Sequence, residues 1–415
     1  MNPKPTRPRH PGSAARDAPA QLASRCNRLA FDLYAHLRQH PGNLVFSPPA
    51  VALSLALAAA GAAGRTRSTL ARVLRWPEDL RGLGPAARAL RLAWRRGPRP
   101  GESALELDSR LWVQPGSPVR AAFQHHCRQL GADVVALDFR RDPEGARGAM
   151  SAWLGRSGAG RGLAPLPAGS VGPLAGRVLG SAAWLRGAWG PPLGAGAVRP
   201  GIFHVSRAVA RSVPLRWAAG RLRTARFELG RAVEAPLREG GTSALLLLPD
   251  EVDGVGELER RLSPESLARW AGALTEGPLE LALPRVELAA RYALREGLSA
   301  MGARAAFQPG TADFSGVDAS PGAPLENLWH AAGLCLGGEP SGAGAASAAP
   351  PGRAARPEPG PRAADAARAS RGPAAARLAA DHPFLLLVRH AATGAILFVA
   401  RVAEPEALPP GTRSG

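Results

Sequence analysis

The segment Asn43-Leu-Val-Phe-Ser-Pro-Pro49 leads directly into an apolar run that ends at Ala63. Its first four residues predict a short buried strand that ends at the two prolines. Ser47 stands where a helix N-cap is expected, and proline is tolerated in a first turn because its missing N–H needs no partner there. The segment therefore predicts a buried strand followed at once by a buried helix over Ala50 to Ala63, a run too short to span a bilayer.

The flanking sequence predicts further helices. Residues 1–20 form a basic, proline-rich stretch that predicts a disordered arm without an apolar signal segment. Apolar residues then recur at steps of three and four, which is typical of an amphipathic helix: Leu22, Cys26, Leu29, Leu33 and Leu37. The basic stretch from Arg65 to Arg99 predicts two helices separated near Pro77.

The second half alternates between strand-like and helix-like segments, which favours an α+β domain with a large sheet. Ser263-Pro264-Glu265 predicts a capped helix start with a first-turn proline. Four segments predict strands, the last two joined in a hairpin by residues 391–394: Ser243 to Pro249, Leu279 to Pro284, Phe384 to His390 and Ala395 to Val402.

Composition limits the class of protein. The 415 residues are 45% hydrophobic, enough for a sizeable core of one large or two medium domains. The formal net charge of +19 favours polyanionic partners, although Lys4 is the only lysine and a compositional bias toward arginine explains the charge equally well. Three widely spaced cysteines exclude a disulfide framework and a four-cysteine zinc site.

Sequence motifs for catalysis are missing. The chain has no Walker A loop, no H-E-x-x-H and no G-x-S-x-G, so we expect no enzyme and no cofactor. His125-His126 is the only histidine pair, and adjacent helical side chains diverge, so we expect a solvated surface rather than a metal site. We expect neither nucleic acid nor membrane as a partner.

Several segments together resemble the serpin family. They occur in family order over roughly residues 22 to 405: Asn43 to Pro48, Gly64 to Thr69, Val178 to Trp189, Leu283-Pro284, Ala312 to Gly316, His330, Asp381 to Phe384 and Ile396 to Arg401. The resemblance implies a large mixed β-sheet with smaller sheets, about eight or nine helices, and an exposed reactive-centre loop. Ser181 stands where most members carry asparagine, and Ala400 where they carry glycine.

This resemblance also sets the expected domain limits. A serpin domain would cover residues 21–405, with a C-terminal tail over 406–415. Within it, residues 340–380 would hold the reactive-centre loop, whose part from Pro340 to Arg377 contains only Pro, Ser, Gly, Ala, Arg, Glu and Asp. Such a composition cannot build a core.

Within the family, the chain most resembles colligin, the collagen-binding heat-shock serpin of the endoplasmic reticulum. The segments that carry this likeness include Leu22 to Tyr34, Val51 to Leu55, Val205 to Arg207 and Ala380 to Phe384. Asp381, with His382 beside it, occupies the position of the aspartate that pairs with an arginine of collagen. The likeness implies a collagen or procollagen partner and a location in the endoplasmic reticulum lumen or outside the cell. Asp381 also lies in a segment common to many serpins, so a packing role explains it about as well.

A serpin inhibits a protease when its cut loop inserts into the main sheet, which requires a hinge of small residues with free N–H groups. The hinge positions are Glu339, Pro340, Ser341 and Gly342. Pro350-Pro351 follows, and proline cannot donate to a ladder, so the sequence predicts that insertion stalls and inhibition is weak or absent. A protein that has lost its function is a further interpretation.

The alternative is a secreted serine-protease inhibitor with an arginine as bait residue. Counting forward from Gly342 identifies Arg356, and counting back from Asp381 identifies Arg371; for each, a solvated arginine in a linker is the competing explanation. A basic helix face could also bind a sulfated glycan such as heparin, as in several serpins, although a solvated face is the alternative. Its residues are Arg88, Arg91, Arg95, Arg96 and Arg99.

Overall fold

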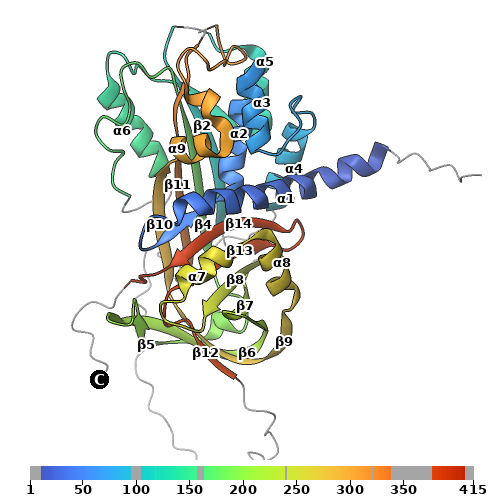
Figure 1. Ribbon diagram of the computed structural model, residues 1–415, viewed down its shortest axis with the longest axis vertical. Helices are drawn as coiled ribbons and strands as arrows, with labels where there is room; N and C mark the ends of the chain where they lie inside the picture. The colour runs from blue at the N-terminus through green and yellow to red at the C-terminus, as the bar shows by residue number, and fades with distance from the viewer. Residues whose placement is uncertain are drawn as a thin grey trace, which may run out of the picture.

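Two β-sheets and the helices around them make up the computed structural model (Figure 1). The structure describes residues 11–94, 104–116, 118–156, 163–238, 241–319, 322–337 and 376–406. Over these ranges the α-helices are α1 (Pro11–Leu37), α2 (Pro48–Gly61), α3 (Gly64–Val73), α4 (Leu83–Trp94), α5 (Ala121–Leu130), α6 (Pro143–Leu154), α7 (Val255–Arg261), α8 (Pro264–Gly272) and α9 (Arg295–Leu298). Short helical turns are η2 (Leu193–Ala195), η3 (Ser299–Ala303) and η4 (Arg304–Phe307).

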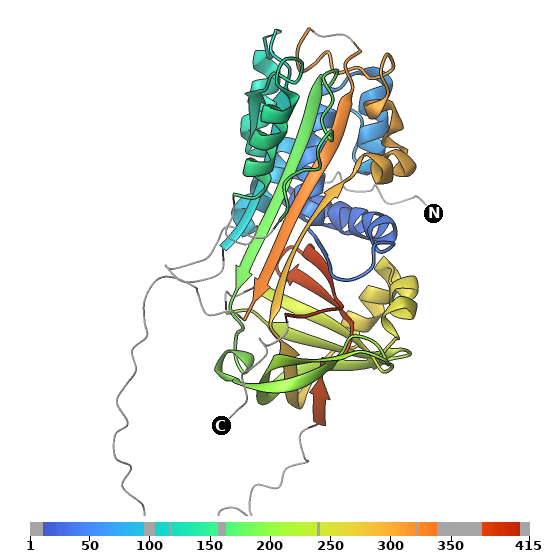
Figure 2. The same cartoon turned by 90° about the vertical axis from the view of Figure 1, so that its left-hand side faces the viewer.

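A five-stranded sheet fills the upper half of the molecule, in the order β10-β11-β4-β2-β3 (Figure 2). Its strands are β2 (Ala104–Val113), β3 (Ala132–Ala136), β4 (Arg177–Gly187), β10 (Val286–Ala293) and β11 (Leu325–Leu336). β11 runs parallel to β4, and β3 runs parallel to β2, whereas the other two pairings are antiparallel. Strands β11 and β4 therefore lie inside the sheet, and β10 and β3 form its edges.

A nine-stranded sheet forms the lower half, in the order β1-β14-β13-β8-β7-β6-β9-β12 with β5 attached to β6. Its strands are β1 (Leu44–Phe46), β5 (Ala197–His204), β6 (Ala210–Phe227), β7 (Gly230–Pro236), β8 (Thr242–Pro249), β9 (Thr275–Pro284), β12 (Ala376–Ala379), β13 (Phe384–His390) and β14 (Ala395–Val402). β14 is buried along its whole length, as its continuous apolar sequence predicts.

Helices cover the two faces of the five-stranded sheet. α2, buried almost throughout, packs on one face and belongs to the main hydrophobic core. α6 packs on the other face over a second cluster rich in tryptophan, which includes Trp112, Trp153, Trp184 and Trp329. The mixed architecture confirms the predicted α+β class with a large sheet. Among the described residues, no helix is long and apolar enough to cross a membrane.

Several predicted elements are confirmed. β13 and β14 have the predicted limits and pair antiparallel. α8 begins after Ser263, whose hydroxyl forms a capping box with Ser266. One prediction is wrong in part: α1 begins at Pro11, so residues 11–20 are not a disordered arm. Alanine-rich sequence in this stretch favours helix, and it extends the amphipathic helix that begins to be buried near Leu22.

Candidate functional site

The contact between β4 and β11, which we call the seam, is the central feature of the five-stranded sheet (Figure 2). The two strands pair in continuous register from Leu328 opposite Leu179 to Leu336 opposite Gly187. The register shifts between Leu325 and Leu328, at the end of the seam where β4 begins. The seam is therefore regular at its lower end and irregular at its upper end.

The chain leaves the lower end of the seam at Gly337. This residue has φ +77°, a conformation that favours glycine, and a Cβ there would lie 2.4 Å from Trp189 Nε1. The next described residue is Ala376, which begins β12 and pairs with Leu279 of β9 in the other sheet. Residues 338–375 thus connect the end of an internal strand of one sheet to the edge of the other.

A buried histidine bridges the seam on its core side. His330 of β11 lies directly opposite Ser181 of β4, and its Nδ1 is 3.0 Å from Ser181 Oγ. The backbone N–H of Ser47 donates to His330 Nε2 at 3.0 Å. Because Nε2 accepts, Nδ1 carries the proton and donates to Ser181. Serine, in place of the usual asparagine, therefore still joins the two central strands through one hydrogen bond.

Ser47 does not act as the helix cap that its position predicts. Its hydroxyl makes no capping bond and donates instead to the carbonyl of Leu397 at 2.8 Å. Pro48 and Pro49 remove two of the first-turn N–H groups that a cap would satisfy, so the hydroxyl is available for β14. The strand–helix junction at residues 43–49 thus holds the seam and the nine-stranded sheet together.

Burial lowers the pKa of His330 to about 3. The unfolded chain takes up this proton near an ordinary histidine pKa of about 6.5. The neutral His330 ring therefore makes its full contribution to the free energy of unfolding above about pH 6.5. That contribution falls as the pH drops toward about 3, by up to about 1.4 kcal/mol per pH unit. We expect His330→Gln to unfold with a flatter pH dependence than the parent between roughly pH 6.5 and 5, measured by denaturant titration.

The matched control is His125→Gln, since His125 is exposed on α5. It should keep the parental slope. Equal slopes for His330→Gln and the parent would show that the buried imidazole is not the group that resists protonation.

A buried ion pair ties the upper end of the seam. Arg177, the first residue of β4, pairs with Asp318, and both side chains are almost fully buried. Arg177 also donates from Nη1 to the carbonyl of Ala323 at 2.6 Å. Asp318 and Ala323 both precede β11, so one guanidinium links the start of β4 to the segment that leads into β11. Burial lowers the pKa of Arg177, against the raising effect of Asp318.

Asp381 and His382 lie together, as their adjacency predicts, in the segment between β12 and β13 of the nine-stranded sheet. His382 Nδ1 is 2.8 Å from Asp381 Oδ1, and His382 Nε2 is 2.9 Å from the carbonyl of Pro249. Both partners accept, so both ring nitrogens donate. Burial disfavours the charged ring, but these two hydrogen bonds outweigh it and raise the pKa of His382. The Asp381 side chain remains 40% exposed.

We expect Asp381→Asn to lower the pKa of His382 toward its ordinary value, because the charged acceptor for Nδ1–H is lost. Titration of the His382 ring by NMR measures the shift. Asp250→Asn is the matched control, since Asp250 acts on His382 only through space and is the smallest of the named influences. A shift as large in the control as in Asp381→Asn would contradict the assignment of the hydrogen bond.

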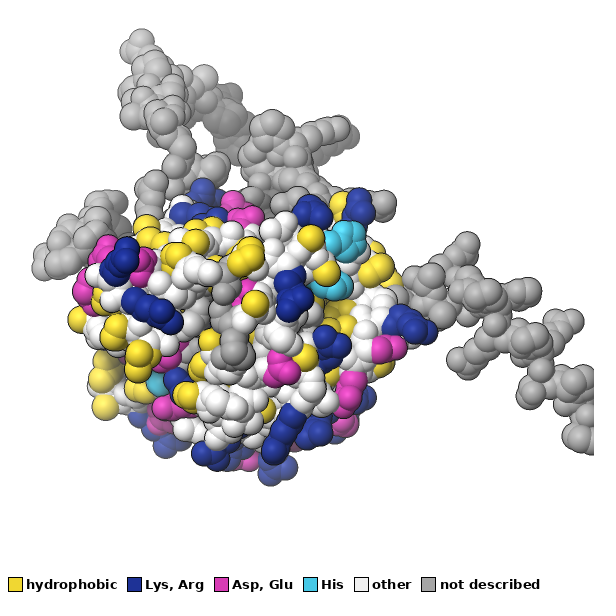
Figure 3. Space-filling view, turned by 90° about the horizontal axis from the view of Figure 1, so that it is seen from above, with side chains coloured by type: hydrophobic (Ala, Val, Ile, Leu, Met, Phe, Trp, Pro, Cys, Tyr) yellow, Lys and Arg dark blue, Asp and Glu magenta, His cyan; other side chains and the backbone are white. Residues whose placement is uncertain are grey.

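The predicted basic face is only partly an open surface. Arg88 is exposed on α4. Arg91 instead donates from Nη1 to the carbonyl of Leu130 at 2.9 Å, at the carboxyl end of α5, and lies against Gly131. Seen from above, Lys and Arg side chains are spread among acidic and apolar ones rather than gathered in one patch (Figure 3).

The other predicted site residues lie outside the described residues, and their roles stay predictions. They are Arg95, Arg96 and Arg99 of the basic face, the hinge positions Glu339, Pro340, Ser341 and Gly342, and the bait residues Arg356 and Arg371. No sequence pattern indicated the Arg177–Asp318 pair, whose members are 141 positions apart. No group of metal-ligating side chains occurs among residues that the structure describes.

Comparisons with known proteins agree with this architecture. A family model described as Serpin (serine protease inhibitor) matches residues 24–405. Serpin B8 of Bos taurus is 28% identical over 378 residues, covering 88% of this chain and 94% of that protein. Leukocyte elastase inhibitor of Xenopus tropicalis is 26% identical over 393 residues, covering 92% and 99%.

Solved structures show the same fold. Uncleaved ovalbumin superimposes with a TM-score of 0.76 at 25% identity, over 92% of this chain and all of the other. Native protease nexin-1 with heparin also gives 0.76, at 20% identity over 93% of this chain and all of the other. The chain therefore belongs to the serpin family. These matches support the family and leave the finer likeness to colligin a hypothesis.

Proposed function

We propose that this serpin inhibits a serine protease by offering residues 338–375 as bait and inserting the cut segment into the seam. The observation that carries the proposal is that the segment begins at the lower end of a seam between two parallel internal strands. A strand that reverses direction after Gly337 would run antiparallel to both neighbours. One of the matched relatives is named as an inhibitor of leukocyte elastase. We propose that the chain itself has no catalytic activity.

The proline pair is less of an obstacle than the sequence alone suggests. β4 has 11 residues, which sets the length of the slot. Residues 338–349 precede Pro350, and a tight reversal uses two to four of them, so about eight to ten can pair before the first proline. Pro350 and Pro351 would then reach the upper end of the seam, where the register between Leu325 and Leu328 is already irregular. This position, together with the named relative, favours inhibition over the non-inhibitory alternative.

The inserted residues would also fit by size. Gly342 to Ala349 contains only glycine, alanine and serine. On its core side the seam is lined by His330 and Ser181, and on its other side by Trp184 and Trp329. A strand of small side chains can enter between such closely packed faces at little steric cost. Pro340 would fall in the reversal, where a fixed φ is favourable.

A protease challenge tests the proposal. With trypsin as the probe we expect a covalent, detergent-resistant complex, and a cleaved chain with a markedly higher melting temperature. Replacing both Pro350 and Pro351 by alanine should raise the fraction of protease trapped, because two N–H donors are restored to the ladder. Pro359→Ala, beyond the slot, is the control and should not change that fraction.

Two variants identify the bait. Arg371→Ala should abolish the complex with trypsin, and mass spectrometry of the released fragment should place the cut after Arg371. Arg356→Ala should leave the complex unchanged, because Pro357 follows Arg356 and resists cleavage by trypsin-like enzymes. Cleavage after either arginine with no complex and no gain in melting temperature would refute inhibition and favour the non-inhibitory alternative.

A collagen-like partner is the second candidate. The Asp381 carboxylate is partly exposed, so an arginine side chain can reach it. Burial raises its pKa, but the hydrogen bond from His382 outweighs that effect and lowers the pKa, so the carboxylate is ionised at neutral pH. We expect immobilised collagen to retain the protein at neutral pH and Asp381→Ala to reduce retention at least about tenfold. Equal retention of variant and parent would end this candidate. We propose a location in the endoplasmic reticulum lumen or outside the cell, which is what the resemblance to colligin implies.

A sulfated glycan remains a proposed accessory partner. The solved structure of protease nexin-1 contains heparin, but its 20% identity relates only the folds. In this chain the support is Arg88, exposed on α4, beside a run of arginines in the sequence.

A further inference from the structure

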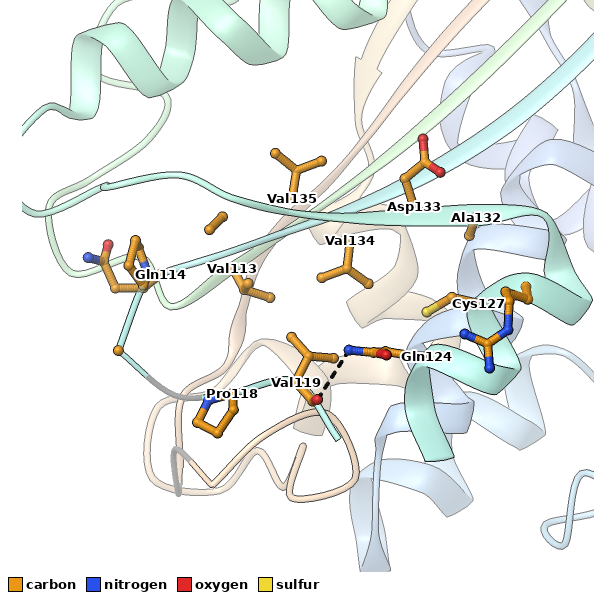
Figure 4. A pocket seen from close by; sticks show the side chains of 14 residues that line it. Val113, Gln114, Pro118, Val119, Gln124, Cys127, Ala132, Asp133, Val134 and Val135 are labelled. Carbon is orange, nitrogen blue, oxygen red and sulfur yellow. Dashed lines mark hydrogen bonds between the residues drawn. The ribbon is translucent and has the colours of Figure 1, made fainter. Parts of the chain in front are cut away.

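A cavity of about 810 Å³ opens between α5, the end of β2 and β3, beside residues 114–116 and 118–119 (Figure 4). Its walls are mainly apolar: Val113, Val119, Val134 and Cys127 face it, whereas Val135 points to the opposite side of β3 (Figure 4). Val113 and Cys127 belong to the main core, whereas Val119 and Val134 are only half-buried. The volume lies within the range of small-molecule sites, and the half-buried valines leave apolar area to cover.

Two polar side chains from α5 stand at the rim. The Gln124 amide donates to the carbonyl of Val119 at 3.4 Å, a long bond that leaves the amide open to a better partner (Figure 4). Arg128, one turn further along, is exposed and lines the same cavity. Its guanidinium has no ion pair or hydrogen bond with any described residue.

The one acidic residue among the described lining residues does not cancel this charge. Asp133 pairs with Arg110 at 2.7 Å, so its negative charge is already balanced. The positive charge of Arg128 at the rim is therefore not compensated by Asp133. Burial raises the pKa of the Cys127 thiol to about 11, so the sulfur is neutral and serves as part of the apolar wall. The cavity therefore combines an apolar interior with a single positive group at its mouth.

We propose that this cavity binds a small amphipathic carboxylate, with its apolar body against the valines and Cys127 and its carboxylate on Arg128. A guanidinium presents two parallel N–H donors that match a carboxylate, and Gln124 adds a further donor. The site is formed by α5, β2 and β3 and lies apart from the seam. A test of this proposal is therefore independent of a test of protease inhibition.

Displacement of a fluorescent probe tests the proposal with the full chain. Anilinonaphthalene sulfonate, an aromatic anion, should bind and be displaced by decanoate. In the parent, decanol should compete about fivefold or more less well than decanoate, because it lacks the charge that Arg128 recognises. In Arg128→Gln the two competitors should become equal, with decanoate weakened by about fivefold or more. Arg140→Gln, an exposed arginine outside the cavity, is the matched control and should behave as the parent.

A second variant fills the cavity without touching its charge. Val134→Phe should weaken the probe at least about tenfold while the melting temperature shows that the chain is folded. The proposal is overturned if decanol and decanoate compete equally in the parent, if Arg128→Gln matches the parent, or if folded Val134→Phe binds the probe unchanged. Since Arg128 is exposed, Arg128→Gln decides the proposal even where Val134→Phe does not fold.

Discussion

The parallel contact between β4 and β11 is the constraint on which the rest of this structure depends. Parallel neighbouring strands cannot be joined by a tight turn, so a long connection must follow or precede each of them. At the end of β11 the chain therefore leaves the five-stranded sheet. It leaves at Gly337 and returns at Ala376, on the edge of the nine-stranded sheet. Residues 338–375 are therefore one of the connections between the two sheets, beside those from β4 to β5 and from β9 to β10, and a change at the seam changes the distance that these residues must span.

The seam is held from its core side and at its upper end by different kinds of interaction. His330 contributes a hydrogen bond between neutral groups, because burial keeps the ring uncharged. This bond therefore carries no cost of burying a charge. Arg177 and Asp318 contribute a charged pair that costs desolvation and is strongly unfavourable to break on one side only. A seam with a neutral bridge along its length and an ion pair at its far end is easiest to part from the lower end, where the chain leaves it.

Local sequence predicted local structure well. The apolar runs of β13 and β14 act within a few residues, and both strands have the predicted limits. α8 begins after the predicted cap at Ser263, whereas α2 runs from Pro48 to Gly61 rather than from Ala50 to Ala63, because proline is accepted in its first turn. Roles that depend on distant partners were not predictable. Ser47 looked like a cap, but its hydroxyl binds Leu397, and Arg177 gave no local sign of Asp318. The ordered family motifs supplied the fold, and the geometry supplied the partners.

The cost of the two loop prolines depends on where in the sheet they would lie. An incoming strand exchanges one parallel ladder for two antiparallel ones, and each added hydrogen bond is worth about 1 kcal/mol net. Two missing donors in the middle of the slot would leave buried carbonyls unpaired, at about 1–3 kcal/mol each. At the upper end, the pairing of β4 with β11 is already irregular between Leu325 and Leu328. Fewer carbonyl groups there would need an N–H donor from the inserted strand. The eight or so bonds formed below therefore outweigh the loss, and position rather than the presence of proline decides whether insertion can finish.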